Sequence, residues 1–488
     1  MDPEQTRSAI SSVPKDLFVG GYWTPAEGNR TMPVENPATG DVLCAVADAD
    51  RSDAVRAIRA AADAQAAWAA TPPRQRSELL RAGYQALLEA QDSLALVISA
   101  EVGKPFAQAR AEVEYAAEFL RWFAEEAVRV AGSFVHHPEN PARRTIVMRR
   151  PIGPSLLITP WNFPLAMGTR KIGPALAAGC CVVLKPAPQT PLSALALAEI
   201  LTRVGVPGGV VNVVPTSAAS PIVTEILATG LVRKLSFTGS TAVGKRLLEQ
   251  CAASVISTSM ELGGNAAFMV FDDADIDAAV ESAMAAKMRN MGQTCTSANR
   301  FYVQAGIAEP FAKRLVERYR GLRMDLQQPA LGDVGPLIDG TAIRKVDRLV
   351  RDATRRGATV LLGGAAAEGR GHFYPPTVLA GVSPESELCS TEIFGPVAAL
   401  MTFEDEADVV AHANATEFGL AAYVFTRDLS RALRVSEQLE VGCVGLNTGT
   451  ISDPTAPFGG VKQSGLGIEG GPDGIKEFLE TKTVAVQL

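Results

Sequence analysis

Three polar residues in largely apolar stretches have side chains suited to acyl chemistry. Cys295, in RNMGQTCTSA, is a candidate nucleophile, although a free cysteine is more often a buried and inert residue. Glu261, in SMELGGN, suits a general base because apolar surroundings raise the pKa of a carboxyl group; the alternative is a carboxylate that bonds its own turn. Asn162, in ITPWNFPL, could donate to a developing oxyanion or simply occupy a turn.

Two further stretches could bind a nucleotide. Gly239 to Gly244, GSTAVG, follows the apolar run RKLSF and precedes a helical pattern, so its backbone N–H groups could approach a phosphate. Glycine turns of this kind also join many strands to helices, and the common GxGxxG fingerprint is absent. Lys185, in VVLKPAPQTP, could reach a ribose hydroxyl or phosphate, or be a solvated charge. Together with the thiol, carboxylate and amide, these stretches indicate acyl chemistry with a nucleotide cofactor.

The elements that must position these residues alternate between strand and helix. Residues 52–132 carry helical apolar spacing, broken at Pro72 and at Gly103 to Pro105. From about residue 145, short apolar runs (SLLITP, CCVVLKP, GVVNVVP, RKLSFTG) alternate with helical stretches, which predicts parallel sheets. Ligands of such sheets bind at the carboxyl ends of the strands. A second alternating block runs from about Gly263 to Gly460.

Bulk properties restrict the class of protein. A chain of 488 residues is too long for one core, since single cores stop growing near ~250–300 residues. A net charge of -7 with scattered basic residues gives no sign of nucleic-acid or membrane binding. No secretory signal and no ~20-residue apolar span occur, so we expect a cytoplasmic protein with reduced thiols. The seven cysteines include no CxxC pair and the four histidines have no ligand spacing, so no metal is expected.

Motifs in a fixed order give the chain a resemblance to the NAD(P)-dependent aldehyde dehydrogenase superfamily over nearly its whole length. Within it, the chain is most similar to the succinate-semialdehyde dehydrogenases. The resemblance implies an α/β fold with a Rossmann-type cofactor domain, an α/β catalytic domain and a small β oligomerisation arm. The stretches that carry it are ITPWNFPL, VVLKPAPQTPLSALALAE, LSFTGSTAVGK, MELGGNAAFMVFDDAD, GQTCTSANRFYVQ, EIFGPV, PFGGVKQSGLGIEGG, EYAAEFLRWFAEEA, KMRNMGQTC, TEFGLAAY and NTGTISDPTAPFGG.

The resemblance also implies domain limits. Residues 1–131 and 151–262 would form the cofactor-binding domain, and residues 263–463 the catalytic domain. Residues 132–150 and 478–488 would form the oligomerisation arm of a homodimer or homotetramer, because exposed apolar strand edges seek partners.

Residue roles follow from the same resemblance. Cys295 would attack the aldehyde, Asn162 would help stabilise the thiohemiacetal oxyanion, and Glu261 would activate the water that hydrolyses the thioester. Glu392 of EIFGP would bind the nicotinamide ribose, with Phe394 against the nicotinamide.

The remaining cofactor contacts are implied in the same way. Lys185 would bind the adenosine ribose, while Thr159, Trp161, Gly239 and Ser240 would line the cofactor site. Two further residues match positions that often assist proton movement, namely Lys171 and Glu469.

Substrate choice depends on charge. A substrate ending in a carboxylate needs cationic or hydroxyl partners, and arginine offers a bidentate fork. Arg170, Arg289 and Ser452 match the clamp of succinate-semialdehyde dehydrogenases. A small aldehyde with a terminal carboxylate is therefore expected, with succinate semialdehyde favoured over glutarate semialdehyde.

Three departures from the family pattern change the expectations. Pro188 replaces a glutamate that hydrogen-bonds the adenosine ribose in NAD-preferring relatives, so NADP should be accepted and could be preferred over NAD. Thr296 and Ser297 follow the cysteine, so the disulfide switch of some relatives is impossible. Ile468 replaces a basic residue of some relatives.

Three other functions remain open on the sequence. A CoA-acylating enzyme would not need Glu261 as a base. An oxidase of uncharged or cationic aldehydes would gain little from the two arginines. An inactive binding member would be expected to lose Cys295 or Glu261.

Overall fold

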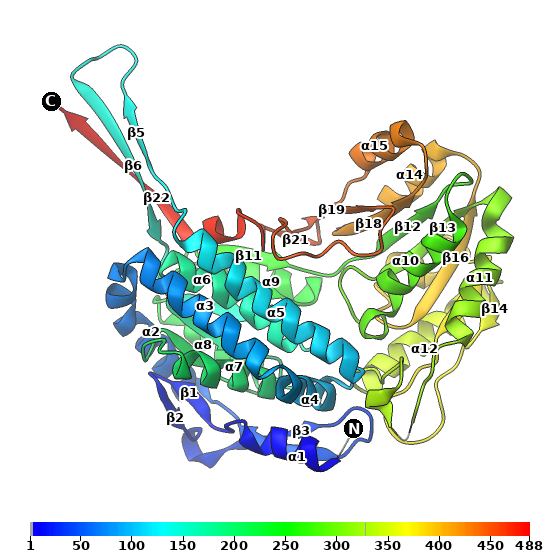
Figure 1. The fold of residues 1–488 in the computed structure, drawn as a ribbon, viewed down its shortest axis with the longest axis horizontal. Helices are drawn as coiled ribbons and strands as arrows, with labels where there is room; N and C mark the ends of the chain where they lie inside the picture. Colours follow the sequence, from blue (N-terminus) through cyan, green and yellow to red (C-terminus); the bar gives the residue numbers. More distant parts are fainter. Residues whose placement is uncertain (1–2, 327) are drawn as a thin grey trace.

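The computed structural model describes residues 3–326 and 328–488 and contains two α/β bodies and a projecting three-stranded sheet (Figure 1). Two separate hydrophobic cores underlie the two bodies. The expected α/β class is confirmed, and the predicted run of helices between residues 52 and 132 is present with both of its breaks. The domain limits given above stay a prediction.

The first body is built on an eight-stranded sheet in the order β2-β1-β9-β8-β7-β10-β11-β21. Its five central strands are parallel, while β1, β2 and β21 pair antiparallel at its edges. The strands are β1 (Leu17–Val19), β2 (Tyr22–Thr24), β7 (Ser155–Ile158), β8 (Val182–Lys185), β9 (Val211–Val213), β10 (Lys234–Thr238), β11 (Ser257–Glu261) and β21 (Gly465–Leu466).

Chain order in this sheet reverses between β7 and β10. The chain runs outward from β7 through β8 to β9, then returns to the other side of β7 for β10 and β11. The loops that leave neighbouring strands at such a reversal diverge and leave a crevice, which is where ligands of open α/β sheets bind. Asn162 lies in the loop after β7, and Gly239 and Ser240 lie in the turn after β10.

Helices cover both faces of this sheet (Figure 1). α6 begins with Pro164 at its first turn and ends at Gly179, whose φ of 97° is accessible to glycine at low cost. The helices of this body are α1 (Pro3–Ser12), α2 (Arg51–Ala70), α3 (Pro73–Glu89), α4 (Gln91–Val102), α5 (Phe106–Ala127), α6 (Pro164–Ala178), α7 (Pro191–Arg203), α8 (Ala219–Ala228) and α9 (Thr241–Ala252).

The second body is built on a seven-stranded sheet in the order β14-β15-β16-β13-β12-β18-β19, parallel except for β14. Its strands are β12 (Ala266–Val270), β13 (Ala298–Gln304), β14 (Thr359–Leu362), β15 (Thr377–Ala380), β16 (Val397–Phe403), β18 (Ala421–Phe425) and β19 (Cys443–Leu446). Its helices are α10 (Ile276–Met288), α11 (Ala308–Arg320), α12 (Gly340–Arg355), α13 (Glu387–Ser390), α14 (Glu406–Asn414) and α15 (Leu429–Gln438).

Smaller elements complete the fold. The pairs β3 (Thr31–Glu35) with β4 (Val42–Ala47), and β17 (Phe418–Gly419) with β20 (Val461–Lys462), are antiparallel. A short 3-10 segment, Arg289–Gly292, leaves α10 toward Cys295. No helix within residues 3–326 and 328–488 combines the length and apolar character needed to cross a bilayer.

The projecting sheet consists of β5 (Ser133–His136), β6 (Arg143–Pro151) and β22 (Leu479–Gln487) and stands clear of both bodies (Figure 1). The C-terminal strand β22 pairs antiparallel with β6 along its whole length. Phe134 and Val135 on β5 keep 59% and 48% of their surface exposed. An apolar edge strand of this kind is a surface suited to pairing with another chain.

Candidate active site

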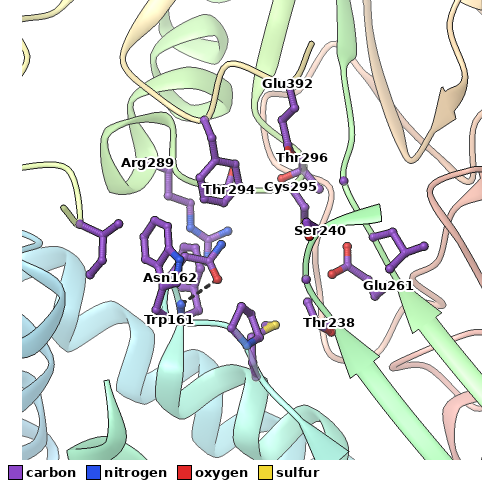
Figure 2. A pocket seen from close by; sticks show the side chains of 18 of the residues that line it. Trp161, Asn162, Thr238, Ser240, Glu261, Arg289, Thr294, Cys295, Thr296 and Glu392 are labelled. Carbon is purple, nitrogen blue, oxygen red and sulfur yellow. Dashed lines mark hydrogen bonds between the residues drawn. The ribbon is translucent and has the colours of Figure 1, made fainter. Parts of the chain in front are cut away.

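One cavity of about 340 Å³ lies between the strand ends of the first body and the loops of the second. Figure 2 shows Trp161, Asn162, Thr238, Ser240 and Glu261 from the first body across from Arg289, Cys295 and Glu392 of the second. Its lining includes Tyr115, Trp161, Asn162, Met167, Arg170, Thr238, Gly239, Ser240, Glu261, Arg289, Thr294, Cys295, Thr296, Lys345, Glu392, Phe394, Ser452 and Phe458.

Cys295 is carried by a constrained loop. Asn290, Met291 and Gly292 all have left-handed backbone conformations, with φ of 49°, 54° and 74°. Such a run costs free energy for non-glycine residues and persists only where its surroundings fix it. A Cβ on Gly292 would lie 2.2 Å from the Gly395 carbonyl oxygen, so this position requires glycine. The loop therefore directs the thiol into the cavity from a fixed backbone.

Hydrogen bonds tie this loop to Asn162 on the first body. The Asn162 side-chain Nδ2 donates to the Gln293 carbonyl oxygen at 2.9 Å. In return, Asn290 Nδ2 donates to the Asn162 carbonyl oxygen at 3.1 Å. A primary amide has two hydrogens, and Nδ2 has no other acceptor among the described residues. The second hydrogen is thus available to a ligand oxygen in the cavity.

Glu261 ends β11 and is almost fully buried, at 3% exposure. Neither of its carboxylate oxygens has a nitrogen or oxygen donor within residues 3–326 and 328–488, and the Cys295 thiol lies close enough to interact with it. Burial, with a contribution from the charge of Glu469, raises the pKa of Glu261 to about 7. Burial, together with the nearby Glu261 charge, also raises the pKa of the Cys295 thiol well above its ordinary value. A carboxyl that titrates near neutrality beside a protonated thiol is poised to exchange protons.

Two arginines occupy another part of the cavity. Arg170 is buried, and its Nη2 lies 2.7 Å from both the Tyr115 hydroxyl and Ser452 Oγ. Its guanidinium stacks over the Phe458 ring, 4.4 Å from the ring centroid. These contacts hold the Arg170 fork in one orientation.

Arg289 lies in the same part of the cavity. Its guanidinium lies over the rings of Tyr115 and Phe163, at 5.3 and 4.8 Å from their centroids. No carboxylate of the described residues forms an ion pair with it. Aromatic faces thus hold a cation whose charge is not neutralised, which favours an anionic ligand group.

Lys171 and Glu469 form a buried pair behind Glu261. Lys171 Nζ lies 2.5 Å from Glu469 Oε1 and also donates to Ser236 Oγ at 2.9 Å. The other Glu469 oxygen lies 3.7 Å from Arg170. The pair therefore neighbours the groups predicted to handle protons, and its role stays a prediction.

The residues present suit a nicotinamide dinucleotide. The Thr238 Oγ1 at the β10 end is buried and lacks a partner among the described residues. At Gly239 a Cβ would lie 2.4 Å from the Phe237 ring, so glycine keeps this turn open. Burial raises the pKa of Glu392 to about 7, and one of its oxygens accepts from Gly264 N–H at 3.2 Å, which leaves acceptor capacity for ribose hydroxyls.

Aromatic rings flank the same side of the cavity. Trp161 and Phe394 meet edge to face with centroids 5.5 Å apart. Phe394 has a φ of 54°, a left-handed conformation that is costly for an aromatic residue and sets the direction of its ring.

Three residues of the predicted cofactor set lie outside the cavity lining. Lys185 ends β8, and its Nζ contacts the Pro186 carbonyl oxygen at 2.8 Å. Burial lowers the pKa of Lys185 to about 8. Thr159 is buried beside it, and its N–H donates to the Lys185 carbonyl oxygen, while Pro188 is half-buried in the following loop. Their roles toward an adenosine ribose stay predictions.

Sequence reasoning did not single out several residues that the fold brings to the site. Tyr115 lies on α5 and contacts both Arg170 and Ser452. Lys345 lines the cavity beside Glu392, and burial lowers its pKa. Tyr115 lies in the stretch EYAAEFLRWFAEEA, where apolar residues recur at helical spacing, and that pattern predicts only a helix of the scaffold. Among the described residues no group of three metal-ligating side chains is found.

The model of the aldehyde dehydrogenase family matches residues 23–484. The chain belongs to the aldehyde dehydrogenase family. It is 50% identical to the NADP(+) succinate-semialdehyde dehydrogenase of Escherichia coli K12 over 475 residues, which cover 97% of this chain and 98% of the relative. It is 49% identical to the glutarate-semialdehyde dehydrogenase of Pseudomonas putida KT2440, over 97% of this chain and 98% of that relative.

Solved structures agree with this assignment. An NADP-dependent enzyme of Escherichia coli superposes with a TM-score of 0.96 at 49% identity, over 99% of both chains. The succinate-semialdehyde dehydrogenase of Burkholderia pseudomallei gives a TM-score of 0.96 at 46% identity, over 100% of this chain and 99% of that one. The aldehyde dehydrogenase fold expected from the motifs is confirmed.

The pKa of Glu261 predicts the pH dependence of this aldehyde dehydrogenase. Only the deprotonated carboxylate can accept a proton, so kcat should rise as pH increases through about 7 and level off above it. The measurement is kcat against pH at saturating cofactor, because Glu392 titrates in the same range. Glu261→Gln should lower kcat strongly and abolish this inflection. An unchanged inflection in that variant would assign the titration to another group.

Proposed function

We propose that this protein oxidises succinate semialdehyde, or a closely related short aldehyde with a terminal carboxylate, to the acid, with NADP or NAD as the hydride acceptor. The observation that carries the proposal is the pair of arginines in the cavity that also holds Cys295. Arg170 and Arg289 present two cations to a small anionic group, beside the mutually hydrogen-bonded hydroxyls of Tyr115 and Ser452, which have one donor hydrogen left between them.

The chemistry follows from the side chains. Cys295 loses its proton, with Glu261 as the nearest carboxylate to receive it, and the sulfur attacks the aldehyde carbon. The free amide hydrogen of Asn162 stabilises the oxygen as it becomes negative. Bound NAD(P)+ supplies the hydride acceptor that turns the adduct into a thioester. Glu261 passes the first proton on to solvent and, again ionised, takes a proton from water, which attacks the thioester carbonyl and releases the acid and the Cys295 thiolate.

Two features bear on the choice of cofactor. Pro188 places no carboxylate near the predicted adenosine ribose, so a 2′-phosphate would meet no repulsion from that position. The Escherichia coli relative is named as an NADP(+) enzyme, whereas betaine aldehyde dehydrogenase of Staphylococcus aureus, at 30% identity, was crystallised with NAD+. We therefore expect NADP to be accepted.

A second candidate function is the oxidation of glutarate semialdehyde, which carries one more methylene. The named activity of the Pseudomonas putida relative favours it. Both substrates present the same two ends, an aldehyde for Cys295 and a carboxylate for the arginines. Their kcat/KM values should therefore differ only by what one methylene contributes, roughly 10- to 200-fold.

The substrate assignment is tested by NAD(P)H formation with succinate semialdehyde, glutarate semialdehyde and butanal, each with both cofactors. Wild type should prefer the carboxylated aldehydes, and Cys295→Ala should show no turnover. Arg289→Met should raise KM for succinate semialdehyde roughly 10- to 100-fold, since a charged hydrogen bond is lost, and change KM for butanal little. Arg81→Met, on the exposed surface of α3, is the matched control. Equal effects on both aldehydes would contradict the clamp.

We also propose that the arm of β5, β6 and β22 joins copies of this chain into a homodimer or homotetramer. Support comes from an apolar edge strand that stands away from its own body. Phe134→Asp with Val135→Asp should then give a monomer in light scattering coupled to size exclusion. Tyr22→Asp, which replaces an exposed aromatic outside the arm, should leave the mass unchanged. A wild-type monomer, or an arm variant of wild-type mass, would reject the proposal.

A further inference from the structure

A buried ion pair lies directly behind the loop that carries Asn162. Lys104 follows α4 and Glu112 lies on α5, and both side chains are almost completely excluded from solvent. The Lys104 ammonium donates to Glu112 Oε2 and lies over the Phe163 ring, 3.9 Å from its centroid. Neither residue lines the cavity. A buried charge pair contributes little net stability over an apolar pair of similar shape, so its position here calls for another explanation.

Lys104 also contacts Asn162, which lines the active-site cavity. Its Nζ donates to the Asn162 main-chain carbonyl oxygen at 2.8 Å. That carbonyl oxygen also accepts from Asn290 Nδ2, so it is held from both bodies at once. A charged donor forms a stronger and shorter hydrogen bond than a neutral one.

The glutamate holds the other end of the same segment. Glu112 Oε1 accepts from the N–H groups of Leu165 and Ala166 at 3.1 and 3.4 Å. N–H groups in the first turn of a helix have no acceptor within the helix, and Phe163, which precedes α6, supplies no side-chain cap for them. The negative charge also suits the positive end of the helix. The pair thus fixes both the carbonyl of Asn162 and the start of the helix that follows it.

We propose that Lys104 and Glu112 are positioning residues that hold Asn162 where its free amide hydrogen meets the developing oxyanion. This inference rests on the proposed role of Asn162 in the reaction. It concerns only the carbonyl end of the substrate, so it applies to whichever aldehyde the wild type oxidises.

The variant Lys104→Met with Glu112→Gln removes both charges without leaving either one buried alone. A misplacement of about 1 Å can cost about 100-fold, so we expect kcat to fall roughly 10- to 100-fold at saturating substrates. KM for the aldehyde should change less than about twofold, because the arginine clamp is intact. If the double variant does not fold, Glu112→Asp is used, which keeps the negative charge beside Lys104 but draws the carboxylate back from α6, and wild-type kcat in that variant would overturn the proposal.

The matched control is Asp53→Asn. Asp53 is another buried carboxylate at a helix start, accepting from Asp50 N–H and Glu27 N–H at the beginning of α2, and none of its hydrogen bonds or ion pairs involves Lys104, Glu112 or Asn162. Its replacement should leave kcat unchanged. A fall in kcat like that of the pair variant would mean that helix capping in general, and not the position of Asn162, is responsible.

A double-mutant cycle separates positioning from general structural damage. The pair substitution is repeated in an Asn162→Ala background, where nothing remains to be positioned. If Lys104 and Glu112 act through Asn162, the further fall in kcat should be less than about twofold. A fall as large as in wild type would overturn the proposal. Loss of activity in wild type itself with every aldehyde would instead reject the proposed function.

Discussion

The carboxylate of Glu261 is buried at the end of β11, where no nitrogen or oxygen donor of the described residues reaches it and its neighbour is the Cys295 thiol. Such a group costs free energy in the folded state unless it is protonated, which is why its pKa rises to about 7. A solvated or hydrogen-bonded glutamate would be ionised throughout the physiological range and would be a weak base. The rest of the site is arranged so that this one carboxyl is dry, close to Cys295 and near the Lys171–Glu469 pair.

The two bodies contribute different halves of the chemistry, and neither is sufficient alone. The first provides Glu261, Asn162 and the turn after β10, all at the carboxyl ends of parallel strands. The second provides Cys295 and Arg289 from a single loop held by left-handed backbone. Hydrogen bonds between Asn162 and the Asn290–Gln293 segment join the halves. The distance between nucleophile and amide donor is therefore set by contacts across the interface.

Much of the fold and part of the site could be predicted from the sequence. The alternation of strand and helix patterns predicts the parallel sheets, because buried parallel strands consist of continuous apolar runs. The motifs around Cys295, Glu261 and Asn162 pointed to residues that do line one cavity. The limits of the domains and the roles of individual residues stay predictions.

Other features were beyond sequence reasoning because they depend on long-range contacts. Lys104 lies in GKP, where spacing indicates only a break between helices, yet its ammonium reaches a carbonyl 58 residues away. Tyr115 has the apolar spacing of a packed helix, and only the folded chain shows its hydroxyl against Arg170. The left-handed run at Asn290 and Met291 has no sequence signal either, because neither residue type requires that conformation.

The most direct test of the account is to trap the intermediate that Glu261 should resolve. Glu261→Gln would be mixed with succinate semialdehyde and NADP, digested and examined by mass spectrometry alongside absorbance of the reduced cofactor. Reduced cofactor should form up to one equivalent per active subunit, more slowly than in wild type because Glu261 also receives the Cys295 proton, and a succinyl group should accumulate on the peptide containing Cys295. Steady turnover at the wild-type rate, or a succinyl group on a different cysteine, would contradict it.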